Sequence, residues 1–106
     1  MSRAERLQQV QKDAWIGDAV LSLWVRLRIL REDGALDGPK YARLTSNECL
    51  GLIAEPSETE ARIGRAYTAG GLEQAFHYIE EHLLPLFEKR EANLLKRSVA
   101  RQPRRG

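Results

Sequence analysis

Residues 14–25 decide the fold, and they read AWIGDAVLSLWV. In a helix of this sequence the apolar side chains run all round the surface, which is typical of a helix surrounded by other protein. Upstream of this stretch, apolar residues recur at helical spacing, so we expect one helix over residues 4–31. This helix is predicted to be the centre of the fold.

A break and a second helix follow the central helix. Residues 32–39, EDGALDGP, contain two glycines and a proline, which interrupt a helix. Pro39 suits the first turn of a new helix, because its missing N–H group is not needed there. The apolar pattern predicts that this second helix runs to Ala54.

Two further apolar stripes predict a third and a fourth helix. The segment from Ser57 to Glu60 has the form of a capping box, so the third helix should begin there. The pair Gly70-Gly71 should end it. A fourth helix is expected over residues 72–87, and Pro85 should bend or locally unwind this helix near Leu84.

Composition agrees with a helical domain. The chain has 106 residues, of which 42% are hydrophobic and 30% charged, as in one water-soluble domain. Ala and Leu together number 27, whereas Val, Ile and Thr together number 12, and this balance favours helix over sheet. We therefore predict an all-α domain of about four or five helices.

The charges divide the chain into a body and a basic end. Residues 1–95 hold 12 basic and 15 acidic side chains, whereas residues 96–106 hold 5 basic side chains and no acidic one. We expect a helical domain over residues 1–95 and a disordered tail over residues 96–106. The single cysteine, Cys49, excludes an intrachain disulfide, and the longest uncharged apolar stretch is too short for a membrane span, so a cytoplasmic location is predicted.

Asp18 is a carboxylate in the most apolar part of the central helix, where burial without a partner would be costly. The adjacent Gly17 indicates close approach of another backbone. On the third helix Glu60 and Gly64 share a face, because they are four residues apart. A crossing of Gly17 on Gly64 would bring Asp18 and Glu60 together, and the two like charges would then favour a proton or a metal ion between them.

Both carboxylates also have ordinary structural interpretations. Asp18 could form a buried salt bridge, with Arg62 or Arg65 as its partner. Glu60 could complete the capping box that starts at Ser57. Either arrangement would use the carboxylate without any ligand.

Three blocks of the sequence resemble the ribonuclease III family, in particular its shorter form, mini-ribonuclease III. Residues 15–26, WIGDAVLSLWVR, resemble the signature helix of the family. Residues 59–76, TEARIGRAYTAGGLEQAF, are similar to its second acidic motif, and residues 44–54, LTSNECLGLIA, to the helix between them. The blocks occur in family order and cover roughly residues 11 to 87. The family has further helical turns and a basic loop before its second acidic motif, whereas this chain passes from Ala54 to Ser57 almost directly.

The resemblance implies a ribonuclease III-like homodimer that cleaves double-stranded or structured RNA with Mg²⁺, or with Mn²⁺ in its place. It carries the metal-ligand and catalytic roles over to Asp18 and Glu60. Other acidic positions of full-length ribonuclease III fall on Ala14, Ser57 and Gln11. Mini-ribonuclease III also lacks acids at the first two of these positions, so the pair fits its pattern.

Two other functions remain open from the sequence: a degenerate family member that binds RNA or a ribonucleoprotein without cutting it, and a purely structural dimer. Recognition of A-form RNA depends on basic side chains that contact phosphates. The candidates for these contacts are Arg26, Arg28, Arg31, Lys96, Arg97, Arg101, Arg104 and Arg105.

Overall fold

The central helix, α1 (Arg3–Asp33), is slightly longer at both ends than the sequence predicts. In the computed structural model, which describes residues 1–101, Ser2 caps this helix. The Ser2 hydroxyl accepts a hydrogen bond from the Glu5 amide, and the Glu5 carboxylate accepts one from the Ser2 amide. Gly34 ends the helix in the left-handed conformation, with a φ of 67°.

The predicted second helix is two short helices, α2 (Gly38–Leu44) and α3 (Asn47–Leu50), so the prediction of one helix from Pro39 to Ala54 was wrong. Ser46 separates the two. Its hydroxyl accepts a hydrogen bond from the Cys49 amide at 3.1 Å and thereby caps α3. Serine competes with helical backbone bonds in this way, and the spacing of apolar residues does not reveal it.

Helix α4 (Pro56–Tyr78) begins earlier than predicted. Its cap is Glu55, whose carboxylate accepts a hydrogen bond from the Glu58 amide at 3.2 Å. The predicted capping box from Ser57 to Glu60 was therefore wrong, because Ser57 already lies inside the helix. Glu60 belongs to the second turn, and its carboxylate is free of the capping role.

The two predicted distortions of the C-terminal half are confirmed. At Gly70 and Gly71 the backbone of α4 leaves the helical conformation, and Gly71 has a φ of 72°. A π-helical turn, η1 (Ile79–Leu83), ends two residues before Pro85, where a proline is expected to disrupt the helix.

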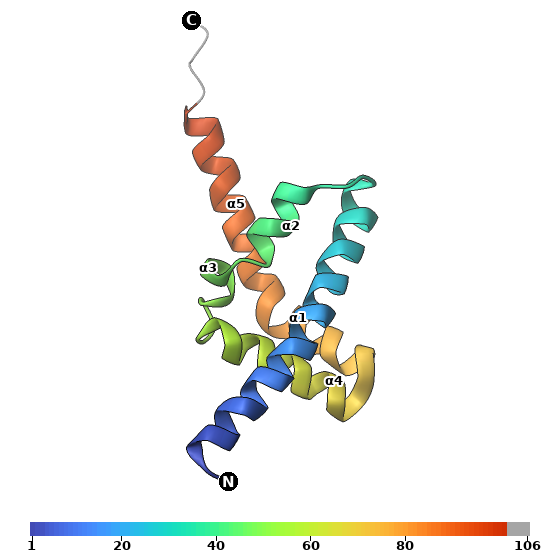
Figure 1. Cartoon of the computed structure of the whole chain (residues 1–106). Helices are drawn as coiled ribbons and strands as arrows, with labels where there is room; N and C mark the ends of the chain where they lie inside the picture. The colour runs from blue at the N-terminus through green and yellow to red at the C-terminus, as the bar shows by residue number, and fades with distance from the viewer. Residues whose placement is uncertain (102–106) are drawn as a thin grey trace, which may run out of the picture.

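The last helix, α5 (Leu84–Arg101), extends into the segment that was expected to be a disordered tail. Residues 96–101 continue the helix, so the composition of this segment was a poor guide to its backbone. Residues 102–106 lie outside the described part of the chain. Figure 1 shows α5 running past α2 towards the C-terminus.

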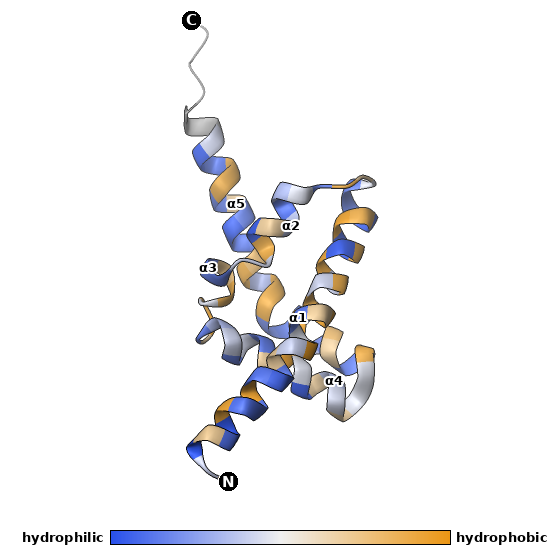
Figure 2. Cartoon of the chain, in the orientation of Figure 1, coloured by the Kyte–Doolittle hydropathy of each residue, from blue (hydrophilic) through white to orange (hydrophobic). Residues whose placement is uncertain are grey.

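The core forms where α1 crosses α4 and meets η1 and α5 (Figure 1). Figure 2 shows hydrophobic residues along the inner sides of these helices. Trp24 is buried against Phe87, with ring centroids 6.0 Å apart. The other buried members of this cluster are Val20, Leu21, Val25, Ile29, Leu44, Cys49, Leu50, Ile63, Ala75, Ile79 and Leu83. None of the helices described is long and apolar enough to cross a membrane.

The described chain covers α1 on one side and leaves part of its apolar surface open. Trp15 is 82% exposed, Leu23 is 41% exposed and Ile16 is 37% exposed. The other described helices leave these side chains uncovered. Packing within one chain therefore buries only part of the apolar residues that surround α1.

Candidate functional site

The site is centred on two glycines that bring α1 and α4 into backbone contact. A Cβ atom on Gly17 would overlap the carbonyl oxygen of Glu60 and lie 3.0 Å from the amide nitrogen of Gly64. A Cβ atom on Gly64 would overlap the carbonyl oxygen of Asp13 and lie 3.2 Å from the amide nitrogen of Gly17. The predicted crossing of Gly17 on Gly64 is confirmed, and the contact is reciprocal.

The reciprocal contact gives the crossing two flanks that are related by an approximate twofold axis. On each helix one charged residue stands four positions before the glycine and another stands one position after it: Asp13 and Asp18 on α1, and Glu60 and Arg65 on α4. Asp13 and Arg65 form the first flank, and Asp18 and Glu60 form the second. One flank therefore carries opposite charges, and the other carries like charges.

The like-charged flank holds Asp18 and Glu60. Burial in the crossing raises the pKa of Glu60 to about 7, and the negative charges of Asp18 and then Glu55 contribute to this rise. Asp18 itself is exposed and Glu60 is partly exposed, so both carboxylates are accessible from solvent. The charge of Asp18 therefore acts on Glu60 across the crossing, whereas the burial expected for Asp18 is not found.

The oppositely charged flank is closed by an ion pair between the helices. The Arg65 guanidinium lies 3.3 Å from the Asp13 carboxylate on α1 and 2.9 Å from the Glu58 carboxylate on its own helix. Gln9 donates a further hydrogen bond to Asp13 at 3.0 Å. Hydrogen bonding to Arg65 lowers the pKa of Glu58, so this carboxylate is ionised at neutral pH.

The arginines expected as structural partners of Asp18 point elsewhere. Arg65 pairs with Asp13 and Glu58, and Arg62 lies 3.4 Å from Glu58. Among the side chains that the structure describes, those of residues 1–98, no salt bridge reaches Asp18 or Glu60. The salt-bridge interpretation of Asp18 and the capping interpretation of Glu60 are both excluded by these contacts.

The three positions that match further acidic residues of full-length ribonuclease III, Gln11, Ala14 and Ser57, provide no carboxylate here. Ala14 is buried beside the crossing, while Gln11 and Ser57 are exposed. Among the residues that the structure describes, no three His, Cys, Asp or Glu side chains gather as a metal-binding group. The candidate site therefore offers two carboxylates and open access for water.

A buried threonine secures the short connection that precedes the site. The Thr59 hydroxyl, fully buried, donates to the Leu50 carbonyl oxygen at 3.0 Å and lies 3.5 Å from that of Ala54. This contact ties the first turn of α4 to the end of α3. The nearly direct passage from Ala54 to Ser57 is thus compatible with a well-placed Glu60.

The candidate RNA-contacting residues lie on two elements. On α1, the Arg26 guanidinium stacks 4.7 Å from the centroid of the Tyr41 ring, Arg28 pairs with Glu32 at 3.0 Å, and Arg31 is exposed. The structure does not bring all the candidates into one cluster. Three others lie on α5, where Lys96 and Arg97 are exposed and Arg101 is the last helical residue. Arg104 and Arg105 lie outside the described residues.

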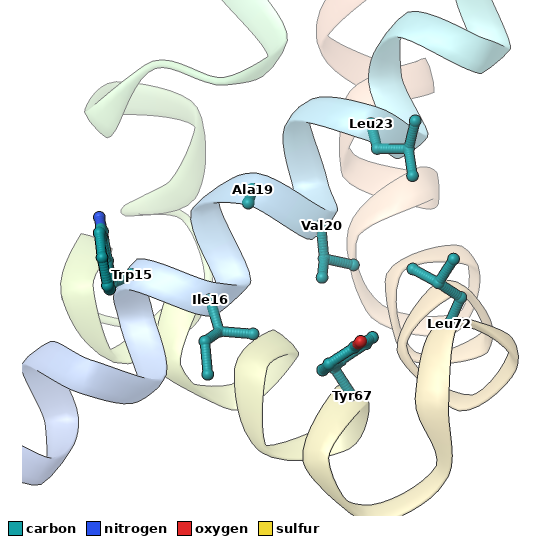
Figure 3. A pocket seen from close by; sticks show the side chains of 7 residues that line it. All are labelled: Trp15, Ile16, Ala19, Val20, Leu23, Tyr67 and Leu72. Atoms are coloured by element: carbon teal, nitrogen blue, oxygen red, sulfur yellow. The ribbon is translucent and has the colours of Figure 1, made fainter.

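The exposed face of α1 borders an apolar pocket (Figure 3). Figure 3 shows Ile16, Val20 and Leu23 along one side of α1, with Tyr67 opposite them. The pocket is lined by Trp15, Ile16, Ala19, Val20, Leu23, Tyr67 and Leu72. Its surface is predominantly apolar and open to solvent.

Reasoning from the sequence missed Asp13 and the true partners of Arg65. The signal was present as a repeated spacing, since an acidic residue precedes each glycine by four positions. Comparing the two glycine segments with each other would have placed Asp13 opposite Arg65.

Comparisons of the chain with protein-family models, with curated proteins and with solved structures found no match.

Proposed function

We propose that this chain is a ribonuclease III-like endoribonuclease that cleaves double-stranded or structured RNA with Mg²⁺, or Mn²⁺, held by Asp18 and Glu60. One observation carries the proposal: Asp18 and Glu60, two accessible carboxylates from different helices, stand beside a close backbone crossing of two glycines, and the charge of Asp18 acts on Glu60. Among the described residues, no cationic side chain pairs with either of them. The three sequence blocks that resemble mini-ribonuclease III supply the reaction class.

The donor set suits a hard divalent cation. Mg²⁺ binds proteins through one or two carboxylates and completes its coordination with water and substrate phosphates. The pair of Asp18 and Glu60 provides two such oxygen ligands, and its mutual repulsion is relieved by a positive charge. On the opposite flank of the crossing, the Arg65 guanidinium already pairs with the Asp13 carboxylate. The crossing therefore has room for a positive charge beside a carboxylate.

The proposed chemistry needs little more from the chain. When bound, Mg²⁺ lowers the pKa of water for attack on the phosphodiester and stabilises the developing negative charge. Asp18 and Glu60 orient the site by approaching from different helices, which fixes their separation through the backbone contact of Gly17. Glu60 acts as a ligand only when deprotonated, so its raised pKa predicts weaker cation binding below about pH 7.

The proposed active form is a homodimer built on the exposed apolar face of α1. Trp15, Leu23 and Tyr67 are all exposed beside the apolar pocket, and a second copy offers the same surface. A twofold interface is self-complementary, so one apolar face can bury its own counterpart. Two sites on one dimer would then face one RNA duplex.

The exposed arginines and lysines of α1 and α5 support the choice of RNA. Arg31, Lys96 and Arg97 are exposed, and cations in such positions attract a phosphate backbone. The proposal includes a cytoplasmic location, which suits the single buried thiol of Cys49.

Cleavage of a long double-stranded RNA tests the proposal. We expect the purified chain to cut with Mg²⁺ or Mn²⁺, and Asp18→Asn and Glu60→Gln to lose cutting while keeping their helical circular dichroism. Glu73→Gln is the matched control, because it removes an exposed carboxylate of the same helix. A wild-type chain that cuts with neither metal, or a Glu60→Gln variant that cuts like the wild type, would contradict the proposal.

A second candidate is a dimer that binds RNA without cutting it. Among the described residues, no third His, Cys, Asp or Glu side chain joins Asp18 and Glu60 in a metal-binding group, and this favours the alternative. It predicts RNA affinity that falls steeply with salt and no cleavage products. A chain with neither cleavage nor salt-dependent affinity would instead be a structural dimer.

A further inference from the structure

We infer that Asp13 and Arg65 are positioning residues for the proposed cation site: their ion pair locks one flank of the α1–α4 crossing and thereby sets the separation of Asp18 and Glu60 on the other. The inference rests on the proposed function, because it assumes that the carboxylate pair binds a divalent cation. It assigns Asp13 and Arg65 no direct contact with the cation.

The contacts place the ion pair at the crossing itself. Arg65 follows Gly64 directly, and the carbonyl oxygen of Asp13 is the group that Gly64 packs against. The side chains of the same two residues then meet at 3.3 Å, so backbone and side chain hold one point of α1 against one point of α4. The Asp13 side chain is only 13% exposed, which limits its freedom to move.

Arg65 is also held from its own helix. Its guanidinium contacts Glu58 at 2.9 Å and Asp13 at 3.3 Å, so it bridges a carboxylate on each helix. A guanidinium has a planar fork of donors that suits such a bridge. Arg62 contacts the same Glu58 at 3.4 Å, but no described hydrogen bond or ion pair joins it to α1.

The backbones of α1 and α4 are in contact at the two glycines. If the ion pair opens, the crossing of the two helices is less constrained on that flank, and the like charges of Asp18 and Glu60 then favour a wider separation on the other. Cation ligands must stay close to their productive geometry for tight binding. Loss of Arg65 should therefore weaken cation binding, although it removes a positive charge from the neighbourhood.

The sign of this effect separates positioning from simple electrostatics. Removal of a nearby positive charge alone would tighten the binding of a divalent cation, since the repulsion between them is lost. Loss of a positioning contact would weaken it, and residues that orient metal ligands typically account for about tenfold or more in affinity. Arg62→Met is the matched control, because it removes the same charge and a contact with the same Glu58 but leaves the crossing untouched.

The experiment titrates the full chain with Mn²⁺ alone and follows free Mn²⁺ by electron paramagnetic resonance. We expect Arg65→Met and Asp13→Asn each to raise the Kd for Mn²⁺ by about tenfold, Arg65→Lys to recover part of the affinity, and Arg62→Met to bind like the wild type or more tightly. The double variant of Asp13 and Arg65 should lose little beyond either single variant, because both remove one contact.

The possible results are distinct. A wild-type chain that binds Mn²⁺, with Arg65→Met binding equally well or better, overturns the inference and leaves the proposed function standing. Equal losses in Arg65→Met and Arg62→Met also overturn it, because the crossing would then play no special part. A wild-type chain that binds no Mn²⁺ overturns the cation site and this inference together.

Discussion

The amide nitrogen of Gly64 lies 3.0 Å from the place that a Cβ atom on Gly17 would occupy, so the backbones of α1 and α4 touch at this point. The close approach places Asp18 and Glu60 within reach of each other's charge. Every proposed property of the site depends on this contact.

Alanine at either glycine should unfold the crossing. A methyl group on Gly17 or Gly64 would overlap a backbone carbonyl of the opposite helix, which cannot rotate away. We expect Gly17→Ala and Gly64→Ala each to cost about 3 kcal/mol or more in unfolding free energy and to lower Tm by more than about 10 °C. Gly38→Ala is the control, since a Cβ atom there meets nothing within 4 Å. Thermal unfolding followed by circular dichroism measures the effect.

Stability should fall as pH rises through neutrality in the absence of metal. The pKa of Glu60 is raised from its ordinary value of 4.5 to about 7, so the folded chain binds more protons than the unfolded chain between these values. Ionisation of Glu60 then destabilises the fold by about 1–2 kcal/mol between pH 5 and pH 8, a figure reduced to allow for solvent screening of a partly exposed group. Glu60→Gln should remove this pH dependence, and Glu73→Gln should keep it. A pH dependence that is unchanged in Glu60→Gln would contradict the assignment.

Mg²⁺ should stabilise the wild type and not the carboxylate variants. A ligand at ten times its Kd adds about 1.4 kcal/mol to the free energy of unfolding. Without metal at pH 8, Asp18→Asn should unfold at a higher temperature than the wild type, because one of two repelling charges is gone. With Mg²⁺ the wild type should gain stability while Asp18→Asn gains little. An Mg²⁺-induced rise in Tm of equal size in both proteins would argue against ligation by Asp18.

A charge on the exposed face of α1 should convert the expected dimer into a monomer. Leu23 is 41% exposed beside the apolar pocket, whereas Leu52 is 51% exposed in the connection between α3 and α4. We expect light scattering to show a dimer for the wild type and for Leu52→Lys, and a monomer for Leu23→Lys, because a buried lysine without a partner is costly. A dimer that survives Leu23→Lys would place the interface elsewhere.

Removal of the Thr59 hydroxyl should loosen the start of α4. The hydroxyl is buried and donates to the Leu50 carbonyl oxygen, which would lose this partner in Thr59→Val. We expect a loss of about 1–3 kcal/mol in unfolding free energy. Thr68→Val is the matched control, because the Thr68 hydroxyl bonds to a carbonyl of its own helix and is exposed. Similar losses in both variants would contradict a special role for Thr59.

The parts of the fold that depend on spacing could be predicted from the sequence. The approximate extent of α1, the break at Gly70 and the distortion before Pro85 each follow from local backbone chemistry. The crossing could be predicted because glycine destabilises the interior of a helix and is favoured there mainly where another backbone packs against it. The chemistry proposed for the crossing still rests on the resemblance.

Other parts could not be predicted, because they depend on competition between groups. The N-caps of α3 and α4 depend on which of several nearby side-chain oxygens accepts a hydrogen bond from a backbone amide. Ser46 begins a separate helix inside the predicted one, and Glu55 caps α4 in place of Ser57. The exposure of Trp15 could not be predicted either. An apolar sequence shows that a surface must be covered, but it does not show by which chain.

The two flanks of the crossing also affect how the chain folds. Gly17 and Gly64 are distant in sequence, so α1 and α4 must find each other across a long loop, which is a slow step in folding. The attraction between Asp13 and Arg65 aids this encounter, whereas the repulsion between Asp18 and Glu60 opposes it. Screening by a monovalent salt weakens both forces, while a divalent cation bound at the carboxylate pair would neutralise the second at a low concentration. Mg²⁺ should therefore accelerate folding at concentrations where sodium chloride has little effect, and the cation would help to build the structure that binds it.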